Sequence, residues 1–364
     1  MRCKTLLIAS LLSFSLVSNV LADMDLDDIR LPPGFSIEIY AEVRNARSLA
    51  AGSNGVVFVS NRRSDSVYAI APGPGKSNRV FEIADDLSTP NGVAYHDGDL
   101  YVAEISRVLV YRDIDNKLDR PPKPETLAID LPSKSHHGWR YIGFGPDNKL
   151  YISIGAPCNI CNEDGFARIV RMNPDGSDRE IWAQGIRNSV GFTWHPDTDE
   201  LWFTDNGRDM LGDDTPPGEL NHAPTKGLHF GYPFCHGGEV PDPEFGKGKS
   251  CDDYISPAQK LDAHVAPLGV KFYTGTMFPE EYRGQILIAE HGSWNRSKKV
   301  GYRISIVAME EGQPASYGVF ADGWLQGEET KGRPVDMLVL DDGSLLVSDD
   351  SNGLVYRISY EGPQ

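Results

Sequence analysis

The sequence predicts an all-β fold, a six-bladed β-propeller. One pattern returns six times: a turn rich in Asp, Asn and Gly, followed by a short strand that is apolar on both faces. Glycine and asparagine tolerate the backbone angles of tight hairpins, and a strand without a polar face is typical of a sheet packed between two others. No amphipathic helical stretch of any length separates the copies. Repeated units of a few strands each therefore indicate a propeller.

Each copy lies within a larger unit of strands. The copies are Ser53–Ser60, His96–Ala103, Pro146–Ser153, Pro196–Phe203, Arg283–Ala289 and Asp341–Ser348. A further apolar strand follows most of them, at Val67–Ile70, Val108–Tyr111, Ile169–Met172, Ile304–Val307 and Leu354–Ile358. A third element precedes several copies, as at Pro90–Tyr95 and Ser189–Trp194. We expect residues 35–40 to add the strand that closes the ring against the last blade, because closure removes exposed strand edges.

The first residues have the features of a secretory signal peptide. Arg2 and Lys4 precede an apolar stretch, and a small-residue cleavage signature ends at Ala22. We expect residues 1–22 to be a signal peptide and residues 23–364 to be the propeller, in a periplasmic or secreted protein. An uncleaved anchor is the alternative, but the apolar stretch is short and interrupted by serines.

Charge narrows the range of partners. The formal net charge is −17, so the protein repels nucleic acid and anionic lipid, and neither is an expected partner. No second apolar run is long enough to span a bilayer, so we expect no membrane span in the mature chain.

Four cysteines follow the predicted cleavage site. An even number in an exported chain favours disulfides. Pairing Cys158 with Cys161 and Cys235 with Cys251 is the simplest connectivity, although the sequence leaves the other two open. The Cys-x-x-Cys spacing also occurs in redox and metal sites. Asn162 stands where c-type haem attachment needs a histidine, and the exported setting favours a plain disulfide.

A long segment around residues 208–267 separates the fourth and fifth copies. It is rich in Gly and Pro but also carries aromatic residues and a cysteine pair. We therefore expect an ordered insertion that caps one face, and long ordered loops on rigid scaffolds usually carry function.

Polar residues at matching places in different blades are the candidate site. His137 precedes a blade strand, Arg187 and Asn188 lie in the matching place one blade later, and Arg333 lies there in the last blade. Loops on one side of a propeller converge on its channel, so these residues predict a ring of cations around one imidazole. Guanidinium groups match carboxylates, which indicates a polyanionic small ligand. His136 competes with His137 for the role of the base.

Two further segments have ligand-binding chemistry. Trp294 and Arg296 follow the fifth repeated strand and are suited to stacking on a planar ring and pairing with an anion, although Trp294 also suits packing between blades. The oxygen-rich stretches 205–209 and 212–214 suit Ca²⁺, although acidic loops often bind nothing. The sequence has no phosphate loop, dinucleotide fingerprint, nucleophile elbow or HExxH motif.

Segments spread over nearly the whole mature chain resemble one known family. They are HHGWRYIGFGPDNKLYISIGAPCNIC, GIRNSVGF, ELNHAPTKGLHFGYPFC, HVAPLGVKFY, FPEEYRGQILIAEHGSWNR, GYRISIV and GRPVDMLVLDDGSLLVSDD. Together they resemble the soluble PQQ-dependent sugar dehydrogenases, most closely their sorbosone dehydrogenase branch. That family has a six-bladed propeller, in agreement with the repeat count.

The resemblance implies a cofactor and a mechanism. PQQ, an ortho-quinone with three carboxylates, would lie over the channel mouth, with Ca²⁺ polarising its reactive carbonyl. His137 would take the proton from the hydroxyl of the sugar while a hydride passes to the quinone, and an external acceptor would then take the electrons. The implied cofactor contacts are Arg187, Asn188, Arg296 and Arg333, to which we add Trp294. Gly207 and Arg208 are the implied backbone ligands of calcium.

Departures from the family pattern bear on the substrate. Val190 stands where glucose-oxidising members carry a glutamine, and Ala156–Cys158 replaces their acidic continuation. An aldose or a sugar-derived aldehyde is therefore the expected substrate. A calcium-dependent lactonase, with Asp205 and Asn91 as metal ligands, is a rival enzyme. A propeller that only binds protein is the non-catalytic alternative.

Overall fold

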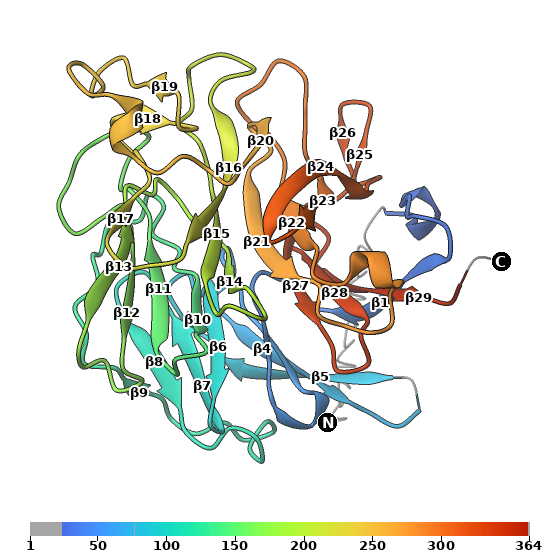
Figure 1. Cartoon of the computed structure of the whole chain (residues 1–364). Coiled ribbons are helices and arrows are strands. Elements are labelled where there is room, and N and C mark those ends of the chain that lie inside the picture. Colours follow the sequence, from blue (N-terminus) through green and yellow to red (C-terminus); the bar gives the residue numbers. More distant parts are fainter. Residues whose placement is uncertain (1–23, 76, 363–364) are drawn as a thin grey trace, which may run out of the picture.

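Six sheets surround one central axis, which confirms the predicted six-bladed propeller (Figure 1). The computed structural model describes residues 24–75 and 77–362, so the predicted signal peptide at 1–22 lies outside the described residues. From the innermost strand outward, the first blade is β2 (Leu49–Ala51), β3 (Val57–Val59), β4 (Val67–Pro72) and β5 (Asn78–Ala84), and the second is β6 (Gly92–His96), β7 (Asp99–Ala103), β8 (Val108–Tyr111) and β9 (Glu125–Thr126). The third blade is β10 (Ile142–Phe144), β11 (Leu150–Ile154), β12 (Arg168–Met172), β13 (Glu180–Gln184) and β17 (Leu228–His229), and the fourth is β14 (Phe192–Trp194), β15 (Leu201–Asp205), β16 (Pro217–Ala223) and β20 (Gln259–Ala263). The fifth blade is β21 (Pro267–Phe272), β22 (Ile286–Glu290), β23 (Arg303–Glu310) and β24 (Gln313–Ala321), and the last is β27 (Pro334–Val339), β28 (Leu345–Asp349), β29 (Leu354–Tyr360) and β1 (Phe35–Glu42).

The ring closes as the sequence predicts. Strand β1 forms the outer edge of the last blade and pairs antiparallel with β29, with Phe35 opposite Tyr360 and Ile37 opposite Ile358. In Figure 1 the blue β1 therefore lies beside the red β29. This pairing ties the two ends of the chain together and leaves the last blade without an unpaired edge at β29.

The repeated apolar strand is the second strand of every blade, and its two faces pack against different neighbours. Leu150 and Ile152 belong to the core shared with the preceding blade, whereas Tyr151 belongs to the core shared with the following blade. Successive side chains of a strand point to opposite faces, so a strand between two blades is mostly apolar on both faces. Six such cores, one between each pair of neighbouring blades, hold the ring together.

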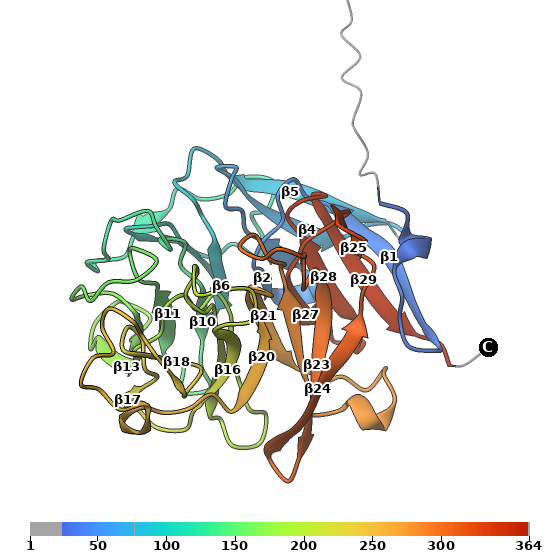
Figure 2. The same cartoon turned by 90° about the horizontal axis from the view of Figure 1, so that it is seen from above.

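The innermost strands approach one another closely at the axis, where Figure 2 shows β2, β6, β10, β21 and β27 gathered in the middle. Gly191, just before β14, has no room for a side chain, because a Cβ there would lie 2.0 Å from the carbonyl oxygen of Leu268. Glycine at this position therefore lets two neighbouring blades meet at the axis.

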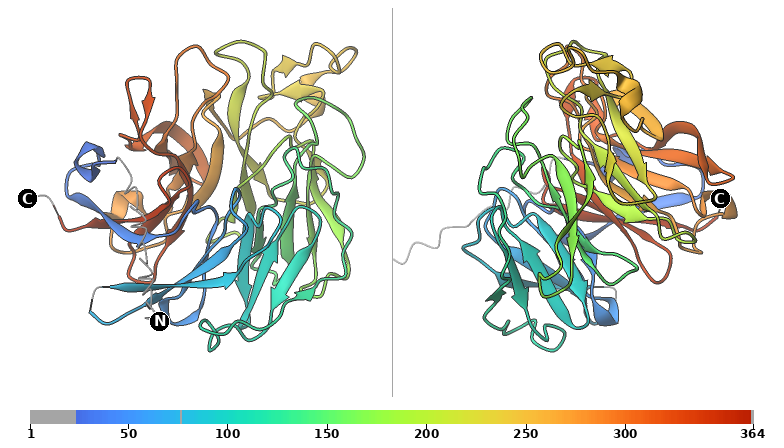
Figure 3. Two further views of the ribbon diagram at one scale, coloured as in Figure 1. Left: turned by 180° about the vertical axis from the view of Figure 1, so that it is seen from behind. Right: turned by 60° about the vertical axis from the view of Figure 1, so that its left-hand side comes forward.

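The segment 208–267 contains two strands of the fourth blade, β16 and β20. Between them, residues 224–258 add β17 to the third blade and form the small hairpin β18 (Cys235–His236) and β19 (Val240–Pro241). This yellow to gold segment lies at the top of the molecule in both views of Figure 3. A second small hairpin, β25 (Leu325–Gln326) and β26 (Glu329–Thr330), lies between the last two blades.

The two disulfides join Cys158 to Cys161 and Cys235 to Cys251, the simplest of the connectivities that the sequence allowed. Four short 3-10 turns complete the fold, at Leu26–Asp28, Ser53–Gly55, Cys251–Asp253 and Glu280–Tyr282. Among residues 24–75 and 77–362, no helix has the length and apolarity to cross a membrane.

Candidate functional site

Loops from around the ring enclose a pocket of about 420 Å³ at one end of the propeller. In an antiparallel blade, the chain enters the innermost strand at the same end at which it turns from the second strand to the third. Residues that precede innermost strands therefore meet residues that follow second strands. The predicted residues that line this pocket are His136, His137, Arg187, Asn188, Gly207, Trp294 and Arg333.

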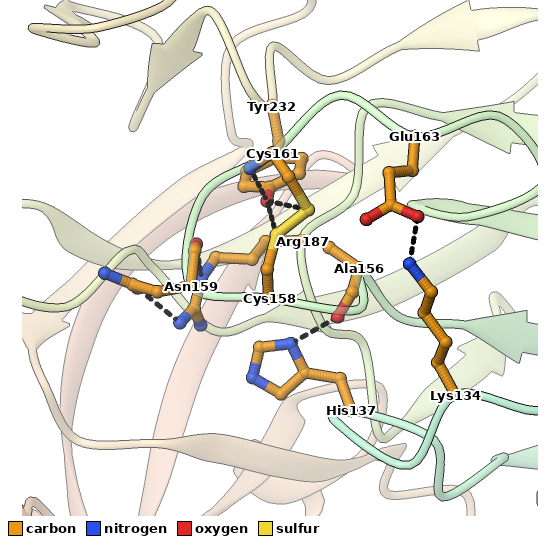
Figure 4. The surroundings of a disulfide bond; sticks show 9 residues. All are labelled: Lys134, His137, Ala156, Cys158, Asn159, Cys161, Glu163, Arg187 and Tyr232. Carbon is orange, nitrogen blue, oxygen red and sulfur yellow. Dashed lines mark hydrogen bonds and ion pairs between the residues drawn. A yellow bond between two sulfur atoms is a disulfide. The ribbon is translucent and has the colours of Figure 1, made fainter.

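His137 is held by the loop that follows β11. Its Nδ1 lies 2.8 Å from the carbonyl oxygen of Ala156, and the side chain is buried (Figure 4). A carbonyl oxygen only accepts hydrogen bonds, so Nδ1 carries the hydrogen and Nε2 keeps its lone pair when the ring is neutral. The residue has a φ of 47°, a left-handed conformation that is uncommon outside glycine and costs about 1–3 kcal/mol. The surrounding loop therefore imposes this orientation on the imidazole.

Burial lowers the pKa of His137 well below its ordinary value, and the positive charge of Arg187 lowers it further. The imidazole is therefore neutral at neutral pH, as a general base must be. His136 is exposed at the rim of the pocket, with its ring 4.2 Å from that of His137, and its pKa is lowered by partial burial and by Arg187. No hydrogen bond within the described residues orients the His136 ring.

The walls of the pocket are strongly cationic in an otherwise acidic protein. Within the described residues, five arginines and one carboxylate line it: Arg47, Arg62, Arg63, Arg187, Arg333 and Asp209. Arg187 donates to Asn159 and forms an ion pair with Asp209, with its Nη2 2.9 Å from the carboxylate. Arg47 pairs with Asp350, which also accepts from His291. The positive charges of the remaining three arginines have no carboxylate partner among the described residues.

Two of these arginines are held in place by uncharged groups. Arg333 donates to the carbonyl oxygens of His291 and Gly292, each at 3.1 Å. The guanidinium of Arg62 lies 3.7 Å from the ring centre of Trp139. Burial and the neighbouring Arg47 lower the pKa of Arg62 to about 10, although the carboxylate of Asp350 acts in the opposite direction.

Asn188 brings an unsatisfied polar atom to the pocket. The side chain is 6% exposed, and its Oδ1 has no hydrogen-bond partner among the described residues. A buried polar atom without a partner costs about 1–3 kcal/mol, which a bound ligand would recover. The buried carboxylate of Asp205 holds this turn, accepting from the backbone N–H of Asn188 at 2.6 Å and of Arg187 at 2.7 Å.

The two predicted calcium ligands lie differently. Gly207 lines the pocket, whereas the guanidinium of Arg208 is buried against Asp242 and Glu244 in the segment 224–258. Among the described residues, no protein donor reaches the carbonyl oxygen of either residue. Carbonyl oxygens suit a hard cation. Residues 24–75 and 77–362 contain no group of three His, Cys, Asp or Glu residues arranged for a metal.

Arg296 lies outside the pocket. It donates to the carbonyl oxygen of Asp213 and pairs with the carboxylate of Asp214, beside a second hollow. Trp294 borders both spaces and is 69% exposed, so it is not packed between blades.

Comparison with known proteins identifies the family. The TrAA12-like family model matches residues 29–361. The chain belongs to the TrAA12-like family. An uncharacterized protein of Borreliella burgdorferi is 34% identical over 351 residues, which cover 92% of this chain and 91% of the relative.

The calcium structure of the Trichoderma reesei Carbohydrate-Active Enzymes Family AA12 protein matches this TrAA12-like chain with a TM-score of 0.80 at 20% identity, covering 92% of this chain and 97% of the other. The holo form of the pyranose dehydrogenase PQQ domain from Coprinopsis cinerea matches with a TM-score of 0.78 at 18% identity, covering 91% and 97%. Both share the propeller fold.

Several pocket residues of this TrAA12-like protein were not assigned a role from its sequence, namely Arg47, Arg62, Arg63, Trp139 and His264. Arg47 carried a usable signal, because it lies two residues before β2 as Arg333 lies just before β27. Arg62 carried none, since its place depends on stacking against Trp139 from another blade.

Proposed function

We propose that this protein is a PQQ- and Ca²⁺-dependent sugar dehydrogenase of the sorbosone type that acts in the periplasm or outside the cell. It oxidises an aldose or a sugar-derived aldehyde and passes the electrons to an external acceptor. The observation that carries the proposal is a cationic pocket beside a neutral histidine whose Nε2 is unprotonated, where three of the arginines have no carboxylate partner among the described residues. The two disulfides support an exported location, because such bonds persist in oxidising compartments.

The charged lining of the pocket supports binding of a planar tricarboxylate. Arg62 and Arg333 offer guanidinium N–H groups that no carboxylate of the described residues occupies, and Asn188 adds a polar group. Bidentate pairing with carboxylates is the interaction for which arginine is best suited. The fold likeness to a PQQ-binding pyranose dehydrogenase domain supports the same ligand class. Gly207, which lines the pocket, would offer its carbonyl oxygen to calcium.

The residues of the chain then have separate tasks. Bound PQQ would accept the hydride from the sugar carbon, with calcium polarising the quinone carbonyl. His137 takes the hydroxyl proton of the sugar at Nε2, while Nδ1 stays bonded to Ala156 and stabilises the imidazolium that forms. An aldehyde substrate would react in its hydrated form, which carries the hydroxyl group that His137 deprotonates. The arginines hold the cofactor and offset its negative charge.

The rival functions find no support in the geometry. The lactonase hypothesis needs Asp205 and Asn91 at the pocket, but neither lines it. Asp205 is bonded to backbone N–H groups, and the side chain of Asn91 is occupied by Arg47 and by the carbonyl oxygen of Arg140. A protein-binding platform would not require a buried histidine of fixed tautomer.

The test is reconstitution of the purified protein. We expect reduction of a redox dye by a panel of aldoses and sugar-derived aldehydes only when PQQ and Ca²⁺ are both added. Hydrolysis of a lactone with calcium alone would support the lactonase instead. The absence of both activities, and of PQQ binding, would refute the proposal.

A further inference from the structure

A short loop after β11 contacts both the base and the cationic wall of the pocket. Residues 156–161 contact His137 and Arg187, which line the pocket, and the Cys158–Cys161 disulfide closes this loop (Figure 4). At its start, the carbonyl oxygen of Ala156 accepts from His137, and the N–H of Ala156 donates to the carbonyl oxygen of Arg187 at 2.7 Å. The same few residues therefore hold two groups that come from different blade connections.

Within this loop, Asn159 binds the guanidinium of Arg187 twice. Its carbonyl oxygen accepts from Nε at 2.9 Å, and its Oδ1 accepts from Nη2 at 2.8 Å. The side chain also binds the backbone of Asp209 twice, accepting from N–H at 2.9 Å and donating to the carbonyl oxygen at 3.1 Å. Asp209 in turn forms the ion pair with Arg187. Asn159 thus fixes both the cation and its counter-ion.

The disulfide adds a covalent constraint on the position of Asn159 to these four hydrogen bonds. Between residues 157 and 162, the backbone N–H of Cys161 is the only one that donates to a protein acceptor within the described residues, namely the hydroxyl of Tyr232 at 3.0 Å. A loop with so few backbone hydrogen bonds has many accessible conformations unless a covalent bond restricts them. The disulfide between Cys158 and Cys161, which flank Asn159 in the chain, supplies that restriction.

We propose that Asn159 is a positioning residue for Arg187, and that the Cys158–Cys161 disulfide holds Asn159 in place, so that the pocket binds an anionic cofactor at full affinity only when this bond is intact. The inference rests on the proposed function for its ligand. It assigns to the Cys-x-x-Cys motif a role in cofactor binding rather than in catalysis.

The first test is a double-mutant cycle on the dissociation constant of PQQ, measured by fluorescence titration of the apoprotein. Asn159→Ala is expected to weaken binding about tenfold, as for the loss of a hydrogen bond to a charged group. If Asn159 acts through Arg187, Asn159→Ala adds nothing to Arg187→Ala, and the double variant binds like the arginine variant. Additive losses would overturn the proposal.

The second test compares the two disulfides. Replacing Cys158 and Cys161 with alanine is expected to weaken PQQ binding by a similar factor. The matched control replaces Cys235 and Cys251, which do not touch Arg187, and should leave the dissociation constant within about twofold of the original. Equal losses in both double variants would overturn the specific role of the first disulfide. Denaturant unfolding of each variant identifies any that fails to fold, and the Asn159 cycle then decides.

A readout without PQQ separates this inference from the proposed function. In ¹⁵N NMR of the apoprotein, the Nε–H of Arg187 should exchange slowly, and faster once Cys158 and Cys161 are replaced. Unchanged exchange overturns the positioning role even if PQQ binds. Failure of the original protein to bind PQQ would refute the proposed function. Faster exchange in the variant without Cys158 and Cys161 would still show that the loop positions Arg187, even if PQQ does not bind.

Discussion

Gly155→Ala should disable the site by displacing the base. Gly155 directly follows β11 and lies against His137. A Cβ at Gly155 would lie 2.7 Å from Cβ of His137 and 2.8 Å from the carbonyl oxygen of His137. It would also lie 3.1 Å from Oδ1 of Asn188. Carbon atoms pack best at about 3.5–4.0 Å, so His137 must move by roughly 1 Å.

The size of the effect follows from that displacement. A misplacement of about 1 Å costs on the order of 100-fold in rate, and overpacking costs about 1–3 kcal/mol of unfolding free energy. We therefore expect kcat of the PQQ-loaded enzyme to fall about 100-fold. The folded state should survive, because domains are typically stable by about 5–15 kcal/mol.

The assay is dye reduction at saturating PQQ and sugar, together with denaturant unfolding. Gly318→Ala in β24 is the matched control, since a Cβ there meets nothing within 4 Å. It should retain full activity. A Gly155→Ala enzyme with normal kcat would refute the assignment of His137 as the base, because a general base displaced by about 1 Å cannot sustain the original rate.

Further predictions concern the histidines and the arginines. His137→Gln should lose about 10²–10⁴-fold in kcat yet still bind PQQ, whereas His136→Gln should change kcat little; equal losses would reassign the base. Because burial holds the pKa of His137 well below its ordinary value of about 6.5, kcat should stay constant through that pH and fall only at more acidic pH, where the buried imidazole gains a proton. The same shift predicts that the free energy of unfolding falls on acidification below about 6.5, and less steeply in His137→Gln; parallel profiles would contradict it. Arg333→Ala should weaken PQQ binding about tenfold or more, whereas the exposed Arg79→Ala on β5 should not; binding insensitive to salt would argue against a cationic site.

Local patterns predicted the fold because a propeller is built from local contacts. Each blade is a meander of neighbouring strands, and the apolar second strand appears as a repeated run with a turn before it, as at Leu150–Ile154. The same reasoning placed residues 35–40 at the closing edge, since closing the ring requires a partner for the exposed edge of its last blade. The register of the blades also brought His137, Arg187 and Arg333 to one pocket, as the sequence led us to expect.

Side-chain partners were harder to predict, because they come from loops whose lengths differ from blade to blade. Arg208 directly follows Gly207, yet its guanidinium turns away to Asp242 and Glu244 in the segment 224–258. Arg296 is likewise held by Asp213 and Asp214 beside a separate hollow. Neither contact follows from strand periodicity.

Repeat spacing and strand alternation encode the all-β class, the six blades, the closing strand and the end of the ring at which polar residues gather, so these features could be predicted from the residues alone. The folded structure was needed to show which pocket arginines lack a carboxylate partner among the described residues, which nitrogen of His137 is left to accept a proton, and that Asn159 binds Arg187 to the disulfide loop. These features depend on distances of a few ångströms between side chains from different blades, and such distances are set by how the loops pack once the ring has closed.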